Sequence, residues 1–331
     1  MKRQFLPSIL ASLLLFAAVI ACTDHVVPIP EPTQLTATNL FSGLRAPIGM
    51  DKDNKGNLWV SEIGTGNNDG AVVMITPNGT KTTFASGFTS VMGPEGGAEG
   101  ISHVMFHDSK LYILHGIEGK LYIADVSNFK AGDAQKSMSD LIVHEYGTQV
   151  RSLGLTTPLN SNLYSMTVGP DGNIYMADAG ANAIFKRDNS TGAISLFAVL
   201  PKVGTGPIVD AVPTGIVFDG SKFLISTLSG GPFVPGSAKI FAVDMSGNVS
   251  IYKDGFTTLT HITLTANNKP LVVKLADFGA TGFAPFTGAV LNEDGTVLLG
   301  GLMMPTDIKR TGDREFYVIS MPLGTIQKLT Y

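Results

Sequence analysis

The chain reads Asn173-Ile174-Tyr175-Met176-Ala177 directly after a turn rich in Asp, Asn and Gly. Five further stretches share this form, an apolar strand after a polar turn. The central residues of the six copies are separated by 53, 63, 49, 48 and 45 positions, and they are Trp59, Tyr112, Tyr175, Leu224, Val272 and Tyr317. Such spacing is typical of a repeat architecture with one supersecondary unit per repeat. The apolar runs are nearly continuous, which predicts strands covered on both faces.

Each copy is preceded and followed by shorter strand candidates in a constant order. An inner strand such as Pro305-Thr306-Asp307-Ile308 comes before the turn, and strands such as Lys239-Ile240-Phe241-Ala242 and Val249-Ser250-Ile251-Tyr252 come after it. Gly and Asn between the last two strands accept the positive φ of a tight hairpin. The unit is a four-stranded antiparallel blade, which cannot bury its own faces. Six blades around an axis can, so we expect an all-β, six-bladed β-propeller over residues 34–331.

The two chain ends predict how the ring closes. After Ser320 only one strand candidate remains, Gly324 to Leu329, so the last blade lacks a fourth strand. At the other end, Leu35 to Phe41 precedes the first inner strand as the fourth strands of other units precede theirs. We expect this N-terminal strand to complete the last blade. An elongated β-solenoid and two sandwich domains are the alternatives, but solenoid repeats are usually shorter, and no linker divides the body.

The first residues have the pattern of a secretory signal. Lys2 and Arg3 give a basic start, and the apolar stretch from Ile9 to Ile20 is too short to span a bilayer. Val19-Ile20-Ala21 precedes Cys22, the only cysteine, in a pattern that resembles the lipobox of bacterial lipoproteins. We expect a signal peptide over residues 1–21 and lipid attachment at Cys22, which would anchor an exported protein in the bacterial cell envelope, on its periplasmic or surface face. An ordinary signal peptide with an incidental cysteine is the alternative.

The residues after the signal narrow the kinds of partner. Residues 22–33 include Pro28, Pro30 and Pro32, which predicts an extended tether. The net charge is only −4, with 15% charged residues and no basic patch. This balance argues against binding of nucleic acid through an electrostatic footprint. No run of 18 apolar residues follows the signal, so no transmembrane helix is expected.

Two loops carry a resemblance to a known family. Pro213-Thr214-Gly215-Ile216, followed by the loop and strand from Leu228 to Phe241, is similar to the corresponding part of the ScyD/ScyE family, as is the loop from Glu62 to Gly70. The resemblance covers roughly residues 38 to 331. It implies an exported propeller of the NHL type, and a role near the extracellular pigment scytonemin is analogy at the level of the fold. The chain departs from the family pattern at Lys274 and Leu275, where an acidic residue is more usual.

Polar residues are expected to line one mouth of the central channel. The loops that enter the inner strands and those that leave the second strands would meet there. The candidate residues for this polar mouth are Glu62, Glu99, His103, His115, Asp178, Asn182, Thr227, His261 and Asp307. No motif identifies any of them as catalytic.

An enzyme hypothesis gives three of these residues a cation. Glu62, Asp178 and Asn182 could hold Ca²⁺ or another divalent cation through oxygen ligands, while His115 or His261 moves a proton. A metal-dependent lactonase or lyase, in the style of gluconolactonases and streptogramin lyases, would follow. The alternative is that the acidic and amide groups close the turns between strands by bonding to local backbone.

A binding hypothesis needs fewer assumptions, and we place it first. The loops present four aromatic side chains, Phe233, Phe278, Phe283 and Phe286. Exposed aromatic residues suit a surface that binds a protein, a glycan or a small molecule. The alternative is that these rings plug the channel mouth. The leading expectation is therefore a lipid-tethered propeller that binds a ligand or partner at the cell envelope.

Overall fold

The computed structural model describes residues 28–93 and 96–331. Every helix and strand of the described residues lies in one compact unit, Glu31–Tyr331. The signal segment and Cys22 lie outside the described residues. No helix in the described part of the chain is long and apolar enough to cross a membrane.

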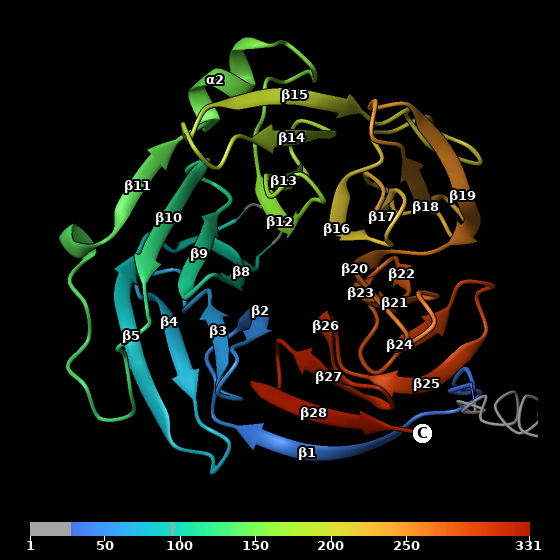
Figure 1. Ribbon diagram of the computed structural model, residues 1–331. Helices are drawn as coiled ribbons and strands as arrows, with labels where there is room; N and C mark the ends of the chain where they lie inside the picture. Colours follow the sequence, from blue (N-terminus) through green and yellow to red (C-terminus); the bar gives the residue numbers. More distant parts are fainter. Residues whose placement is uncertain (1–27, 94–95) are drawn as a thin grey trace, which may run out of the picture. The chain divides into compact units, whose positions relative to one another are not determined.

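Six four-stranded antiparallel sheets surround a central axis within the unit Glu31–Tyr331, which confirms the six-bladed β-propeller (Figure 1). The first three blades are β2(Pro47–Lys52) β3(Leu58–Glu62) β4(Gly70–Ile75) β5(Lys81–Phe88), then β8(Ile101–His107) β9(Lys110–His115) β10(Lys120–Asp125) β11(Ile142–Glu145), then β12(Leu163–Val168) β13(Ile174–Asp178) β14(Ala183–Arg187) β15(Ile194–Val199). The last three are β16(Pro213–Phe218) β17(Phe223–Thr227) β18(Ala238–Val243) β19(Val249–Phe256), then β20(Leu259–Leu264) β21(Pro270–Lys274) β24(Gly288–Asn292) β25(Val297–Leu302), then β26(Pro305–Gly312) β27(Glu315–Ser320) β28(Thr325–Thr330) β1(Thr36–Ser42).

Small elements decorate the connections between these strands. They are the ribbon β6(Val91–Met92) β7(Ala98–Glu99), the ribbon β22(Phe278–Gly279) β23(Gly282–Phe283), a 3-10 turn at Met138–Asp140 and the short helix α2(Gly147–Ser152).

The ring closes as the sequence predicts. Strand β1 pairs with β28 in antiparallel register, from Thr36 opposite Thr330 to Ser42 opposite Thr325, and supplies the outer strand of the sixth blade. Figure 1 shows β1, at the start of the chain, beside β28, at its end. The innermost strands β26 and β2 also contact each other, so the sixth blade packs on the first.

The hydrophobic core is divided among the blade interfaces. Among the described residues the buried apolar side chains form six clusters, and each cluster joins two neighbouring blades. Trp59 of the first blade, for example, packs with Leu111 and Phe129 of the second. The second strands β3, β13 and β17 are buried along their whole length, as their continuous apolar runs predict.

Three threonine hydroxyls link four successive inner strands, β16, β20, β26 and β2. Thr214 Oγ1 donates to the Leu259 carbonyl at 2.8 Å, and Thr260 Oγ1 donates to the Pro305 carbonyl at 2.9 Å. Thr306 Oγ1 continues the series to the Pro47 carbonyl at 3.3 Å. These bonds fix the relative height of the inner strands, and therefore of the side chains that project toward the axis.

Candidate functional site in the central channel

A shared irregularity places one residue of each inner strand at an equivalent position. The register shifts between Pro47 and Gly49 in β2 and between Pro305 and Asp307 in β26. The other four inner strands shift at the corresponding place. The six residues at or just after the shift, named here the channel ring, are Gly49, His103, Ser165, Gly215, His261 and Asp307.

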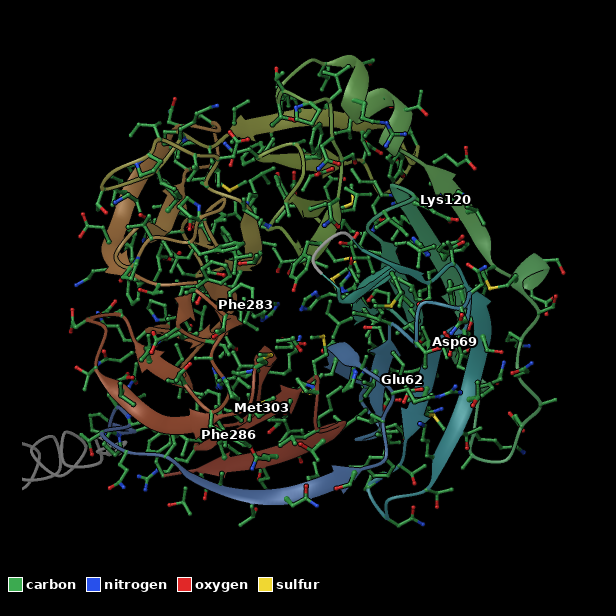
Figure 2. All side chains as sticks on the ribbon, turned by 180° about the vertical axis from the view of Figure 1, so that it is seen from behind. Glu62, Asp69, Lys120, Phe283, Phe286 and Met303 are labelled. Atoms are coloured by element: carbon green, nitrogen blue, oxygen red, sulfur yellow. The ribbon has the colours of Figure 1, made fainter. Side chains whose placement is uncertain are left out.

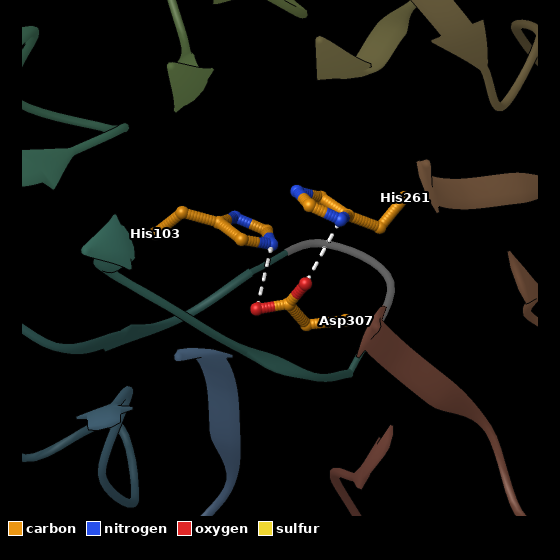
Figure 3. A group of neighbouring side chains, drawn as sticks. All are labelled: His103, His261 and Asp307. Carbon is orange, nitrogen blue, oxygen red and sulfur yellow. Dashed lines mark ion pairs between the residues drawn. The ribbon is translucent and has the colours of Figure 1, made fainter. Parts of the chain in front are cut away.

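Three members of the channel ring form a close polar group, the channel cluster of His103, His261 and Asp307. His261 Nδ1 lies 2.8 Å from Asp307 Oδ1, and His103 Nε2 lies 4.0 Å from Asp307 Oδ2, as the dashed lines in Figure 3 indicate. The two imidazole rings stack with centroids 4.8 Å apart and planes at 9°. One donor atom from each residue lies within 4.8 Å of the other two, so the cluster could hold a metal ion.

The donor atoms of this cluster are buried and lack aligned partners. Asp307 is 1% exposed and His103 is 3% exposed. Among the described residues, His103 Nε2, His261 Nδ1 and Asp307 Oδ1 have no hydrogen bond of acceptable geometry. His261 Nδ1 and Asp307 Oδ1 are close enough for an ion pair, but their angles do not suit a hydrogen bond. Buried polar atoms left in this state are costly unless a further group satisfies them.

Other contacts hold the three side chains in place. The Tyr164 carbonyl lies 2.9 Å from His103 Nδ1, and Ser165 Oγ lies 3.3 Å from His261 Nε2. The Met50 backbone N–H donates to Asp307 Oδ2 at 2.7 Å. Each member of the cluster is therefore oriented by a partner on another strand.

The two glycines of the channel ring allow the inner strands to approach closely. A Cβ atom at Gly49 would lie 2.7 Å from His103 Cα and 2.8 Å from the His103 ring. At Gly215 it would lie 2.5 Å from Ser226 Oγ and 3.0 Å from His261 Cα. Side chains at these two positions would displace the histidines.

Burial and charge shift the titration of the cluster. Burial lowers the pKa of His103 to about 4, despite the opposing effect of the Asp307 charge. Burial alone would raise the pKa of Asp307, but the charges of His261 and His103 and the hydrogen bond from the Met50 amide together hold it below its usual range. At neutral pH the site therefore contains a carboxylate and a neutral His103.

A cavity of about 140 Å³ adjoins the channel cluster. All six inner strands line this cavity. On each strand, the lining residues are the channel-ring residue itself or residues that follow it in the sequence. The cavity therefore extends toward the ends of the inner strands that lead into the tight turns. Along the same side, Lys309 Nζ lies 2.6 Å from Asp51 Oδ1, which places a charged pair next to the cluster.

The structure brings together three of the nine predicted mouth residues, His103, His261 and Asp307. The three residues expected to hold Ca²⁺ have local partners instead. Glu62 Oε1 accepts from the Arg45 backbone N–H at 2.8 Å and lies 2.7 Å from Lys81 Nζ.

Asp178 and Asn182 close the turn that follows β13. Asp178 accepts from Ser161 Oγ and from the Asn162 and Ala181 backbone N–H groups. Asn182 bonds to the backbone of Leu200, Ala211 and Val212. These contacts match the turn-closing alternative, and they give the Glu62, Asp178 and Asn182 cation prediction no support.

The remaining mouth candidates lie outside the channel cluster. His115 is fully buried in the second blade, where Nε2 lies 3.0 Å from the Thr89 carbonyl. Thr227 Oγ1 bridges the Lys239 backbone, and Glu99 lies exposed on the ribbon strand β7. A proton-transfer role for His115 in the channel is therefore not supported.

The loop aromatics cluster on the fifth and fourth blades. Phe233, Phe278 and Phe283 contact one another with ring centroids 4.8 to 5.1 Å apart. Phe286 is 58% exposed. Figure 2 shows Phe283 and Phe286 over the fifth blade, on the opposite side of the ring from Glu62. Because three of the rings pack against each other, a single exposed phenylalanine remains as a contact surface.

Ser165, Gly49 and Gly215 were missed by reasoning from the sequence. A signal for them exists: when the inner strands are aligned on their first residue, Pro47-Ile48-Gly49, Pro213-Thr214-Gly215 and Pro305-Thr306-Asp307 superpose. The third position of that alignment is the channel ring.

Comparisons with known proteins bear on the fold. No protein-family model matches the chain, and no curated protein matches it. A virginiamycin B lyase from Staphylococcus aureus is similar in structure, with 14% identity over 90% of this chain and 100% of its own and a TM-score of 0.53. A PQQ-bound aldose sugar dehydrogenase from Streptomyces coelicolor has 12% identity over 91% and 99%, with a TM-score of 0.55. A gluconolactonase from Xanthomonas campestris has 11% identity over 90% of each chain, with a TM-score of 0.55. Identities this low show the propeller fold alone, and the ScyD/ScyE resemblance stays a prediction.

Proposed function

We propose that the channel cluster binds a divalent cation and that the protein is a metal-dependent lactonase or lyase. The observation that carries this proposal is the convergence of His103 Nε2, His261 Nδ1 and Asp307 Oδ1, three buried donor atoms without aligned hydrogen bonds. A cation between two imidazole lone pairs and a carboxylate would satisfy all three atoms at once.

The donor set indicates which cations fit. Ca²⁺ and Mg²⁺ prefer oxygen ligands, whereas two imidazoles and one carboxylate suit Zn²⁺, Fe²⁺ or another first-row transition metal. Ligands at about 2.1 Å from one ion lie at most ~4.2 Å apart, and the cluster spans 4.8 Å. Binding therefore requires the most distant side chains to close by at least ~0.6 Å, and by about 1.4 Å for the tetrahedral geometry of Zn²⁺. The Ca²⁺ expected from the oxygen ligands is replaced in this proposal by a transition metal.

The residues around the cluster would divide the work. His103, His261 and Asp307 hold the cation, which when bound polarises a carbonyl oxygen and so favours attack on an ester or lactone, or its elimination. Met50, Ile216 and Ile262, whose side chains belong to the cores between the blades, also line the cavity. Lys309, paired with Asp51 at 2.6 Å, supplies the cationic donor that would orient an anionic part of the substrate.

The similar structures support a catalytic role over a purely binding one. These proteins are a lyase, a sugar dehydrogenase and a gluconolactonase, and the support is at the level of the fold. The binding hypothesis rests on the loop aromatics, three of which are packed against each other.

Metal analysis of the purified full-length protein tests the proposal. We expect about one transition-metal ion per chain after loading with Zn²⁺, Mn²⁺ or Fe²⁺, and loss of that ion in His103→Gln and Asp307→Asn. His107→Gln is the matched control, because His107 pairs with the exposed Asp108 at the outer end of β8. Wild type that retains no more metal than His103→Gln would refute the site.

Activity is tested separately on a panel of lactones and esters. Turnover should require the metal and fall at least 100-fold in His103→Gln, with His107→Gln unchanged. Folding of each variant is checked by its unfolding midpoint. Metal binding without turnover of any member of the panel would leave a cation site but remove the enzyme proposal.

A further inference from the structure

Two consecutive residues of β12 contact both histidines of the channel cluster. The Tyr164 carbonyl lies 2.9 Å from His103 Nδ1, and Ser165 Oγ lies 3.3 Å from His261 Nε2. One contact uses the backbone and the other a side chain. A single strand of the third blade therefore holds imidazoles that come from the second blade and the fifth.

The contact with Tyr164 decides the tautomer of His103. A carbonyl oxygen only accepts hydrogen bonds, so Nδ1 carries the proton and donates it. Nε2 of the neutral ring is then a lone pair, and it faces the Asp307 carboxylate at 4.0 Å. A lone pair and a carboxylate that face each other in a buried site are both acceptors, and a cation between them resolves the conflict.

His261 has two tautomers, and each leads to different chemistry. With the proton on Nδ1, the ring donates to Asp307 and Nε2 accepts from the Ser165 hydroxyl, which is the arrangement of a Ser-His-Asp triad. With the proton on Nε2, the ring donates to Ser165 and Nδ1 becomes a lone pair. The 2.8 Å contact between Nδ1 and Asp307 Oδ1 suits the first state in the metal-free protein. Coordination of a cation through Nδ1 requires the second state, because a protonated ring nitrogen has no lone pair for a metal ion.

We infer that Ser165 is a positioning residue: it accepts a hydrogen bond from His261 Nε2–H and thereby makes His261 Nδ1 a metal ligand. The inference rests on the proposed cation site. Outer partners of ligating histidines fix the tautomer, and their loss typically weakens metal binding 10–100-fold. Ser165 is 1% exposed, so solvent cannot readily replace its oxygen.

The first test reads the tautomer in the full-length protein loaded with Zn²⁺. Long-range ¹H–¹⁵N spectra of histidine side chains distinguish protonated from unprotonated ring nitrogens. We expect His261 of the wild type to carry its proton on Nε2, and we expect that proton to exchange with solvent faster in Ser165→Ala, which lacks the hydroxyl that accepts it. His103 should keep its Nδ1 proton in both proteins, because its partner is a backbone carbonyl. A proton on Nδ1 of wild-type His261 would overturn the inference.

The second test measures Zn²⁺ affinity by competition with a chelator. Ser165→Ala should bind 10–100-fold more weakly than wild type, and Ser165→Thr should recover most of the loss because it restores the hydroxyl. Thr167→Val is the matched control, since Thr167 lies two residues along the same strand face and lines the same cavity. Equal affinities of wild type and Ser165→Ala contradict the positioning role.

A fluorophosphonate probe examines the competing triad. No covalent labelling of Ser165 is expected, and labelling would show that Ser165 is a nucleophile rather than a positioning residue. If wild type binds no metal, the proposed function fails, and the positioning role that rests on it fails with it. If wild type binds metal with His261 protonated on Nδ1, the inference alone fails.

Discussion

Gly49 shows how much the channel depends on a missing side chain. A Cβ atom there would lie 2.7 Å from His103 Cα, closer than unbonded carbons can approach, so β2 and β8 would have to separate. We expect Gly49→Ala to lower the free energy of unfolding by ~1–3 kcal/mol, the usual cost of overpacking, and to weaken metal binding. Urea unfolding and metal analysis measure the two effects.

A second glycine provides the control for that substitution. A Cβ atom at Gly206 meets nothing within 4 Å, and its φ is not in the left-handed region. Gly206→Ala should therefore be neutral or slightly stabilising. If both variants have the wild-type urea midpoint, close approach at Gly49 does not limit the packing of the channel.

Two buried histidines should make stability depend on pH. Burial lowers the pKa of His103 to about 4 and also lowers the pKa of His115. Between pH 6.5 and 4 these histidines bind protons in the unfolded chain but remain neutral in the folded chain. Their contribution to the free energy of unfolding is therefore complete above pH 6.5 and falls as the pH drops. For His103 the loss reaches ~3 kcal/mol by pH 4. Urea unfolding of the chelated protein between pH 7 and pH 4.5 measures it.

Single substitutions test whether the pH dependence of stability comes from these two histidines. His115→Gln should flatten the pH dependence, because the amide keeps a donor for the Thr89 carbonyl without a titrating group. Gly206→Ala should leave the slope unchanged, since it removes no titrating group and its added Cβ atom meets nothing within 4 Å. A wild-type midpoint that stays constant from pH 7 to 4.5 contradicts the assigned burial effects.

The residues of the channel cluster could be named as candidates from the sequence. That they lie close together could not be predicted. His103, His261 and Asp307 were among nine polar candidates near the inner strands. Their convergence depends on the register shift that brings one side chain per blade to the axis. A shift of that kind leaves no periodic trace in a single strand, because it adds one residue near the start of the strand.

At the scale of elements, the polar residues predicted at the ends of the second strands have local hydrogen-bond partners. Glu62, Asp178 and Thr227 do occupy equivalent places in their blades, as the repeat predicts. Each bonds to its own loop or neighbouring strand. A repeat generates equivalent positions in every blade. Turn closure and ligand binding would both place polar residues at this spacing, so the spacing does not distinguish the two roles.

Strand β1 should decide whether the ring holds together. It pairs along β28, and Leu35, just before it, is 2% exposed within the cluster that joins the fifth and sixth blades. A chain that begins at residue 44 lacks both features and leaves β28 as an open edge. We expect it to lose at least ~2 kcal/mol from the buried leucine alone and to self-associate. A chain that begins at residue 34 is the control, with urea midpoints and size-exclusion profiles as the readouts.

The truncation also tests the predicted ring closure, which followed from the number of strands in each repeat. The last repeat lacked one strand and the chain start had one to spare, so pairing of the two ends followed from the number of strands. If the chain from residue 44 matched the control in both readouts, β1 would be dispensable and closure would rest on the contact between β26 and β2.

At the scale of the whole molecule, the fold was readable because its core is repetitive. Six interfaces with similar apolar content produce six similar strands, and a period near 50 residues makes them visible. The channel has the opposite character: its six ring residues include two glycines, two histidines, a serine and an aspartate. Blade packing tolerates many sequences. The residues of the channel ring differ from blade to blade, so the channel ring cannot be recognised by repetition.

The final prediction concerns the attachment of the ring to the envelope. Glu31, at the start of the propeller unit, accepts hydrogen bonds from Thr265 Oγ1 at 3.0 Å and Asn267 Nδ2 at 2.6 Å, in the turn where the inner strand β20 has ended. The channel cavity extends toward that same end of the inner strands. Glu31 therefore lies on the side of the propeller unit toward which the cavity extends. Cys22→Ser should lose the lipid and appear in the soluble fraction, while Thr23→Ser remains with the membrane. Equal membrane retention of both variants would contradict lipid anchoring and leave an ordinary signal peptide as the explanation of the N-terminal sequence.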